Sequence, residues 1–404
     1  MSAERNEPQD GASRPLGMLR ELGRKLASGE AGTLLVLLMV AVIWVFFQLQ
    51  NNRFLSAGNL TNLALQQAAV ATISIGVVLI LLLGEIDLSV GAVSGVTSAV
   101  MAVLIVKGNV SPMLAVLAAL ALGAGIGLFN GIMVTRFRIP SFVVTLAGSL
   151  TLVGLQLYVL GATGTVNLGD NFVTKMTSSY FPPVVAWPIG AVFIALAATF
   201  ALTGRARRKA EGLHVGSMRA LVGGIVAISA AIVALVWITS QDRGLPLIVC
   251  LVVLLALVFA YITERTRFGR HMFAVGGNAE AARRTGVKID HVRIMVFVLG
   301  STLAALGGVF AASRLLAVNQ SSGGSDLLLM AIAGPVIAGT SLFGGRGSVW
   351  SALLGAIVIG SIANGMNLLA LDSSIKYMVT GAVLIAAVTI ESVTRIRRVG
   401  DKGP

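Results

Sequence analysis

Charge, cysteine and histidine are all scarce in this 404-residue sequence. Asp, Glu, Lys and Arg together make up 12% of it, where a soluble domain carries about 25%. The single cysteine, Cys250, excludes an intrachain disulfide and falls in an apolar stretch, where we expect it to be a small buried residue. The three histidines lack metal-ligand spacing, and no carboxylate cluster or nucleophile elbow accompanies them. We therefore expect this chain to bind no metal or cofactor and not to be an enzyme by itself.

Apolar residues are what the sequence has in abundance. Hydrophobic types reach 56% and the mean hydropathy is +0.90, values typical of integral membrane proteins. Apolar stretches of about 20 residues, enough for a helix to cross a hydrocarbon core of roughly 30 Å, recur along the chain. We predict an all-α polytopic membrane protein with about twelve transmembrane helices. The expected spans are 31–49, 63–83, 88–106, 112–134, 139–161, 184–203, 219–240, 245–263, 291–313, 326–342, 349–370 and 374–390.

The basic residues are distributed unevenly between the two sides of these spans. With the amino terminus inside the cell, the cytoplasmic segments hold 24 of the 30 Lys and Arg residues. This is the positive-inside pattern, so the net charge of +13 reports orientation and not a nucleic-acid partner. Both termini are expected in the cytoplasm. The predicted organisation is an uncleaved cytoplasmic segment over 1–30, a transmembrane domain over 31–390 and a cytoplasmic tail over 391–404.

Two short stretches echo each other. GLFNGIMV at 127–134 and GSIANGMNLL at 360–369 are each followed by a polar turn and a further span. They lie seven spans apart, and an odd offset inverts the second copy, as in transporters built from inverted repeats. The match rests on few residues, so chance similarity is the alternative. If the repeat is real, the helices over 184–240 are an inserted pair.

The stretch GEIDLSV places two carboxylates, Glu85 and Asp87, between long apolar runs. A carboxylate at the bilayer centre costs about 2.5–3.5 kcal/mol on insertion scales, so neither is expected to face lipid. We expect Gly84 to end one helix, Asp87 to cap the next and Glu85 to lie near that helix's positive end. Two interpretations stay open: an ordinary cytoplasmic turn, or a discontinuous helix bordering a translocation pathway.

A polar stretch, TERTRFGRHMFAVGGNAEAARRTGVKIDHVR at 263–293, is too polar to cross the membrane and too long for a minimal turn. It contains the signals of a short capped helix of about seven residues, well under the roughly 12–15 at which isolated helices become even marginal. We expect a soluble partner to give this helix its shape, and packing on the protein's own spans is the alternative. The residues that would start and end it are Asn278, Glu280, Arg283, Arg284 and Gly286.

The glycine-rich stretch GPVIAGTSLFGGRGSVW at 334–350 is similar to a phosphate-cradling loop in its glycines alone. The required Lys followed by Ser or Thr is missing, and the stretch joins two spans instead of a strand and a helix. A nucleotide site is therefore excluded. We expect a close backbone crossing or a gate hinge there.

Four stretches in order carry a resemblance to a known family: GEIDLSVG, IPSFVVTLAG (139–148), TRFGRHMFAVGGNAEAARRTGV (266–287) and AGTSLFGGRGSVWSALLGA (338–356). They resemble the permease subunits of bacterial ABC importers for simple sugars, the ribose and xylose group, over about residues 55–395. The extra helix pair over 184–240 and the Glu of GEIDLSVG make the chain look most like the D-xylose permeases of that group.

The resemblance implies a vitamin B12 importer-like fold in the bacterial inner membrane, with two permease copies pairing as a homodimer. A separate cytoplasmic ATP-binding subunit would hydrolyse ATP, a periplasmic binding protein would deliver the sugar, and the segment from Asn278 to Gly286 would be the coupling helix. Because a sugar is neutral, its pathway needs polar groups and no fixed counter-charge. The candidate pathway residues are Glu85, Asp87, Ser89, Ser94, Thr97, Asn130 and Asn364.

Two other classes of protein compete with this interpretation. A proton-driven secondary transporter would use Glu85 or Asp87 as its proton-binding site. A passive channel has little beyond the glycine content in its favour. Dependence of uptake on ATP or on a proton gradient separates the three, whereas the identity of the sugar is not readable from this subunit, because a separate binding protein would select it.

Overall fold

The computed structural model describes residues 32–212 and 217–400, so the whole expected cytoplasmic segment 1–30 and the last four residues of the tail lie outside it. A helix covers most of each of the twelve expected spans. These helices are α2 (Gly32–Gln50), α3 (Ala57–Leu82), α4 (Val90–Val106), α5 (Pro112–Arg136), α6 (Ser141–Leu160), α8 (Pro183–Ala210), α9 (Met218–Ser240), α10 (Leu247–Arg265), α13 (Ile289–Leu315), α14 (Ser325–Ile337), α15 (Trp350–Leu368) and α16 (Ser373–Gly400). The last runs through the start of the expected tail.

Not every one of these helices is long enough to cross a membrane. By length and hydropathy, eight of the described helices qualify: α3, α5, α6, α8, α9, α10, α13 and α15. The apolar helices α4 and α14 are shorter, and the 13 residues of α14 rise only about 20 Å. The helical, polytopic class is thus confirmed, whereas the count of twelve complete crossings stays a prediction.

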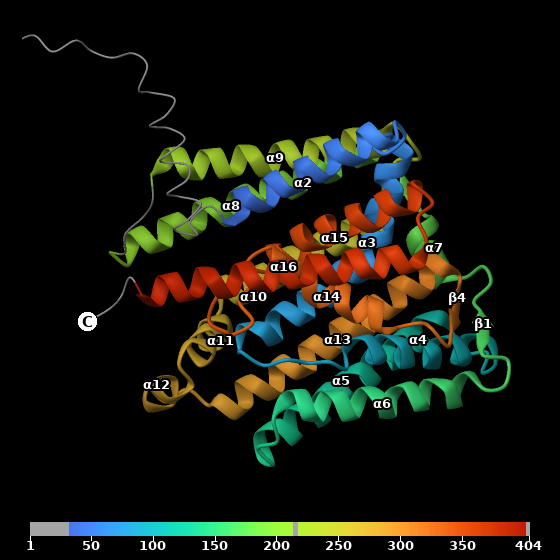
Figure 1. Ribbon diagram of the computed structural model, residues 1–404, viewed down its shortest axis with the longest axis horizontal. Helices are drawn as coiled ribbons and strands as arrows, with labels where there is room; N and C mark the ends of the chain where they lie inside the picture. Colours follow the sequence, from blue (N-terminus) through green and yellow to red (C-terminus); the bar gives the residue numbers. More distant parts are fainter. Residues whose placement is uncertain (1–31, 213–216, 401–404) are drawn as a thin grey trace, which may run out of the picture.

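Helix α3 lies at the centre of the bundle, where 83% of its most apolar window is buried. It packs against α13, α14, α15 and α10, and α13 also packs along α5 (Figure 1). The glycine stripe of α5 faces α13: a Cβ added at Gly127 would lie 2.3 Å from the carbonyl oxygen of Phe297. Small residues let helix backbones approach closely in lipid, which is the packing that the spacing of Gly123, Gly127 and Gly131 predicts.

Helices α8 and α9 form a peripheral pair. Only 11% and 6% of their apolar windows are buried, and they pack chiefly on each other. In Figure 1 they run together along the upper border of the bundle. The arrangement is compatible with an inserted pair, which stays a prediction.

Four short strands depart from the all-α expectation. β1 (Thr165–Asn167) pairs antiparallel with β4 (Ala317–Asn319), and β2 (Tyr180–Phe181) pairs with β3 (Leu245–Pro246). They gather at one end of the bundle, which we call the sheet end. Beside the second pair, the guanidinium of Arg243 lies 4.8 Å from the centre of the Tyr180 ring, and burial raises the pKa of that phenol above its ordinary value.

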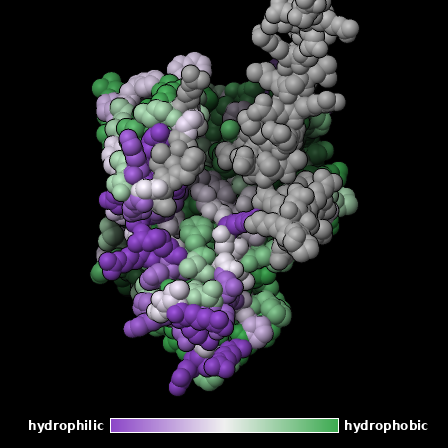
Figure 2. Space-filling model, turned by 90° about the vertical axis from the view of Figure 1, so that its left-hand side faces the viewer, coloured by the Kyte–Doolittle hydropathy of each residue, from purple (hydrophilic) through white to green (hydrophobic). Residues whose placement is uncertain are grey.

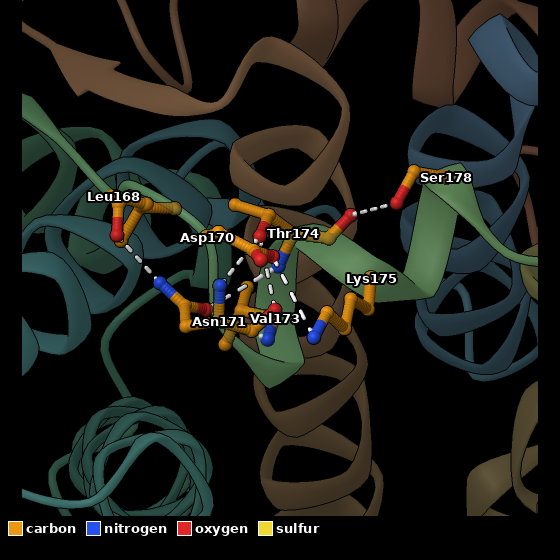
Figure 3. Close-up of polar contacts among 7 residues, drawn as sticks. All are labelled: Leu168, Asp170, Asn171, Val173, Thr174, Lys175 and Ser178. Atoms are coloured by element: carbon orange, nitrogen blue, oxygen red, sulfur yellow. Dashed lines mark hydrogen bonds and ion pairs between the residues drawn. The ribbon is translucent and has the colours of Figure 1, made fainter.

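The expected outer stretch between α6 and α8 is folded and not a bare loop. Its helix α7 (Phe172–Ser178) begins with a reciprocal capping box: the Asn171 side chain accepts from the amide of Thr174 while the Thr174 hydroxyl accepts from the amide of Asn171 (Figure 3). The buried Ser313 hydroxyl of α13 donates to the carbonyl of Val173 at 2.6 Å. The helix is therefore anchored to the bundle.

The other end, which we call the basic end, holds the helices α11 (Arg267–Gly277) and α12 (Ala279–Arg284). The end of α3 and the turn between α5 and α6 lie there too, because Leu82, Val134, Val144 and Met272 share one apolar core with Ala282. Figure 2 looks onto this end and shows hydrophilic side chains gathered over part of it.

Candidate functional site

The GEIDLSV stretch begins where α3 ends. Gly84 adopts a positive φ of 75°, its amide donates to Leu81, and the amide of Glu85 reaches back to the carbonyl of Ile80. This pair of bonds is a Schellman motif, which satisfies carbonyls that a helix end otherwise leaves unpaired. Residues 83–89 then run irregularly to the start of α4. The expected helix end at Gly84 and the break after it are both present.

Glu85 pairs with a basic side chain from a distant part of the chain. Its Oε1 lies 3.2 Å from Nε of Arg293 on α13, with 14% and 28% of the two side chains exposed. Arg293 thus supplies a counter-charge for the Glu85 carboxylate. The ion pair also ties the irregular segment to the first turns of α13.

Asp87 does not cap α4, which corrects the expectation from the sequence. The N-cap residue is Ser89, and the Oδ1 atom of Asp87 accepts from both the amide and the hydroxyl of Ser89, at 2.7 and 2.5 Å. Asp87 therefore closes a turn ahead of the helix, an alternative that short acidic side chains offer the backbone. Asn130 of α5 extends the chain of contacts by donating to the Ser89 hydroxyl at 3.2 Å.

The second carboxylate oxygen of Asp87 has a different environment. The side chain is 4% exposed, and Oδ2 has no hydrogen-bond partner within the described ranges. Asp87 also borders a cavity of about 10 Å³, which is roughly enough space for one water molecule. The other residues that line it are apolar: Val77, Ile80, Leu81, Ile86 and Ile332.

The remaining candidate pathway residues do not gather at this place. The buried hydroxyls of Ser94 and Thr97 donate to carbonyls of their own helix, each at 2.7 Å. Asn364 lies near the sheet end, where it accepts from Asn59 in the first turn of α3. About 35 Å of helix separates that turn from Glu85, at 1.5 Å per residue. The structure thus brings Asp87, Ser89 and Asn130 together and leaves Asn364 apart.

Two hydroxyls of α6 belong to the site although sequence reasoning did not select them. Ser141 accepts from the amide of Ile86 at 3.3 Å, and Thr145 accepts from the amide of Leu88 at 3.0 Å. Both supply partners for backbone donors in the irregular segment, which no helix hydrogen bond satisfies. The available signal was their place in IPSFVVTLAG, one of the four stretches that carried the family resemblance.

Gln156 of α6 is a further residue that the sequence analysis missed. The side chain is 2% exposed, and its amide donates to the carbonyls of Asn319 and Ser322, both at 2.9 Å. These bonds hold the end of β4 and the loop that follows it to α6, and the same loop also touches α4. There Gly323 approaches so closely that an added Cβ would lie 2.2 Å from the carbonyl oxygen of Gly91. A lone amide in an apolar span was the only signal for it.

The short helix α12 forms as predicted, with Asn278 as its cap. The Asn278 side chain accepts from the amide of Ala281 at 2.9 Å, and Gly286 at φ 85° lies in a Schellman exit. Glu280 and Arg284 form an exposed ion pair at 3.4 Å. The residues of the expected set that lie exposed at the surface are Asn278, Glu280, Arg283, Arg284 and Gly286.

The expectation that a soluble partner shapes this helix is wrong. Ala282 is 4% exposed and packs in the same apolar core as Met272, Val275 and Val292. The helix is therefore held by the protein's own α11 and α13, the alternative that the sequence left open. Its charged side chains remain free of that core.

The glycine-rich stretch after α14 makes the expected close backbone crossing. The amide of Gly345 donates to the carbonyl of Leu82 in the last turn of α3, at 2.9 Å. The other expectation, a gate hinge, stays a prediction.

Comparison with known proteins covers almost the whole chain. A family model described as the permease component of a branched-chain amino acid transport system matches residues 59–388. The xylose transport system permease protein XylH of Escherichia coli K12 is 34% identical over 359 residues, which cover 89% of this chain and 91% of the relative. XylH of Haemophilus influenzae is 31% identical, covering 91% and 98%. The ribose import permease protein RbsC of Bacillus subtilis is 30% identical, covering 93% and 94%.

No solved structure matches the chain. The sequence relatives confirm the resemblance to the ribose and xylose group of permeases that the four ordered stretches indicated. The vitamin B12 importer-like fold stays a prediction.

Proposed function

Because the chain belongs to the transport-system permease family whose model spans residues 59–388, we propose that it is the membrane subunit of an ATP-driven ABC importer for a monosaccharide, D-xylose. The observation that carries this proposal is the 34% identity to a xylose permease across 89% of the chain. Ribose is the next substrate to compare, since ribose permeases are the relatives at 30% identity.

The distribution of charge supports an orientation with the basic end in the cytoplasm. The turn between α5 and α6, the end of α8, and helices α11 and α12 carry Arg and Lys there, as the positive-inside rule requires of cytoplasmic segments. The sheet end then faces the periplasm. In the inner membrane of a bacterium, that face would receive sugar from a separate binding protein.

The exposed surface of α12 is the proposed docking element for a cytoplasmic ATP-binding subunit. Ala282 anchors the helix in the core, so that the helix is in place before any partner binds. A preformed surface of this kind avoids the cost of ordering a segment on binding. Pairing of two permease copies completes the proposed complex.

The cluster of Asp87, Ser89 and Asn130 is the proposed sugar-contacting part of the pathway near the basic end. Hydroxyl, amide and carboxylate groups are the kinds of side chain that a neutral polyol can hydrogen-bond. All three residues are buried in this conformation, so the cluster would be exposed to sugar only after a movement of the bundle. The proposal gives Glu85 a structural role, because it forms an ion pair with Arg293.

Reconstitution tests the proposal directly. The chain, an ATP-binding subunit and a sugar-binding protein from the same genome would be assembled in proteoliposomes, and uptake of labelled xylose, ribose and a branched-chain amino acid measured with and without ATP. We expect ATP-dependent uptake of xylose above the other two. Uptake by the chain alone, driven by a proton gradient, would overturn the ABC assignment, and preference for ribose would correct the substrate.

A further inference from the structure

Three segments that are far apart in the sequence meet in direct backbone contact at the basic end. They are the end of α3 at Leu82 and Gly84, the end of α11 at Gly276, and the loop after α14 at Gly344 and Gly345. We call these five residues the glycine junction. Gly84 begins the stretch GEIDLSVG, Gly276 lies in the stretch 266–287, and Gly344 and Gly345 lie in the stretch 338–356. The three segments thus come from three different stretches that carry the family resemblance.

The contacts leave no room for a side chain. A Cβ added at Gly276 would lie 1.8 Å from the carbonyl oxygen of Leu82 and 2.8 Å from the amide nitrogen of Gly345. One added at Gly344 would lie 2.8 Å from the Gly276 carbonyl oxygen and 2.8 Å from the Gly84 nitrogen. Real Cβ contacts essentially never fall below 3.0 Å, so any larger residue at Gly276 must displace α11 or α3.

A hydrogen bond closes the junction. The carbonyl of Leu82, in the last turn of α3, accepts from the amide of Gly345 at 2.9 Å. Gly344 and Gly345 both have positive φ, 85° and 71°, a backbone region that L side chains rarely adopt. Contact between backbones is stiff compared with contact between flexible side chains, so a displacement of one segment is passed to the others.

The glycine junction lies between two segments for which a function has been proposed. Gly276 is separated from α12 only by Gly277 and Asn278, and Asn278 ends α11 and caps α12. On the other side, Gly84 is followed directly by Glu85, and Asp87 lies two residues further along. The junction thus lies between the exposed helix proposed to dock the ATP-binding subunit and the buried carboxylate segment proposed to contact sugar.

We propose that Gly276 is a positioning residue for transport, through which movement of α11 and α12 is transmitted as one body to residues 83–89. This inference rests on the proposed function. It goes beyond it by assigning the coupling between ATP hydrolysis and the pathway to a backbone contact that requires glycine.

The substitution Gly276→Ala tests the proposal, with Gly277→Ala as its matched control. An added Cβ at Gly277 meets no atom within 4 Å, so that change adds the same methyl group one residue away without a clash. Both variants would be assembled with the ATP-binding and sugar-binding proteins in proteoliposomes, and sugar uptake and ATP hydrolysis measured together. We expect Gly277→Ala to match the wild type and Gly276→Ala to lose about tenfold in uptake per ATP while still hydrolysing ATP.

Retention of wild-type uptake per ATP in Gly276→Ala would overturn the proposal, as would an equal loss in both variants. If the wild-type complex itself shows no ATP-dependent uptake, the proposed function fails instead, and the two failures are distinguishable in the same assay.

A second measurement keeps the proposal testable if Gly276→Ala does not fold. Spin labels would be placed by cysteine substitution at His271 of α11 and at Ile86, which are both exposed. A third label at the exposed Lys175 of the sheet end serves as the reference, and Cys250→Ala removes the native thiol. Across nucleotide states of the assembled complex, we expect the distance between His271 and Ile86 to stay constant while their distances to Lys175 change. A nucleotide-dependent change between His271 and Ile86 would overturn transmission as one body.

Discussion

Replacing Glu85 by Gln separates a structural role of this carboxylate from a proton-relay role. At the observed 3.2 Å, the attraction between Glu85 and Arg293 is about 5 kcal/mol at an effective dielectric constant near 20. Most of this offsets the cost of taking both charges out of water. Removing the carboxylate leaves the Arg293 guanidinium unpaired with 28% of its side chain exposed. We therefore expect a loss of about 1–3 kcal/mol, below the 3–5 kcal/mol of a fully buried pair.

The loss would be measured by unfolding the purified chain with SDS in mixed micelles. Asp170→Asn is the control, since its pair with Lys175 is long, at 3.7 Å, and highly exposed, and is expected to contribute less than about 1 kcal/mol (Figure 3). A double-mutant cycle with Arg293→Gln isolates the pair itself. A loss from Glu85→Gln no greater than that from Asp170→Asn would refute the reasoning.

The same variant has a transport readout. In proteoliposomes held below its unfolding temperature, we expect Glu85→Gln to keep most of its ATP-driven uptake, because a paired carboxylate does not need to exchange protons. Complete loss of uptake in a folded, assembled variant would instead favour the proton-coupled mechanism.

Three further predictions follow from individual contacts. Thr145→Val leaves the amide of Leu88 without its acceptor and is expected to cost about 1–3 kcal/mol in the same unfolding assay, whereas Thr151→Val, which removes an exposed hydroxyl bonded within its own helix, should cost little. Gln156→Leu removes both donors that hold the loop after β4, and we expect faster hydrogen exchange at 319–324 than in the wild type; unchanged exchange would contradict the assigned contact. Reversing the charge of Arg283 and Arg284 to Glu should abolish copurification with the ATP-binding subunit while membrane insertion stays intact, and normal copurification would remove α12 from the docking surface.

Local features of the fold were predictable from the sequence, because their physical causes are local. Apolar runs located the twelve helical segments, Gly84 located the end of α3, and Asn278 and Gly286 located the bounds of α12. Each depends on residues within one or two turns of itself, through helix length, capping bonds or positive φ. The four ordered stretches indicated the permease family, because each can be recognised from its own residues alone.

Long-range features were not predictable, because no local pattern records which distant residue supplies a partner. The ion pair of Glu85 with Arg293 joins residues more than 200 positions apart, and the bonds of Gln156 to the loop after β4 join residues more than 160 apart. Strands of two or three residues are too short to show an alternating pattern. Asp87 illustrates a local ambiguity. A short acidic side chain can either cap a helix or close a turn just before one, and here the cap is Ser89, two residues after Asp87.

The contact of Gly323 with α4 has a consequence for the energy balance of a cell. At that point two backbones touch without intervening side chains, so a file of water molecules has no space between them. Protons move through membranes along such files, and a bacterial membrane stores its energy as a voltage. If the chain works as the proposed importer, a contact of this kind would help to keep the resting protein electrically insulating, so that the membrane is not discharged between transport cycles.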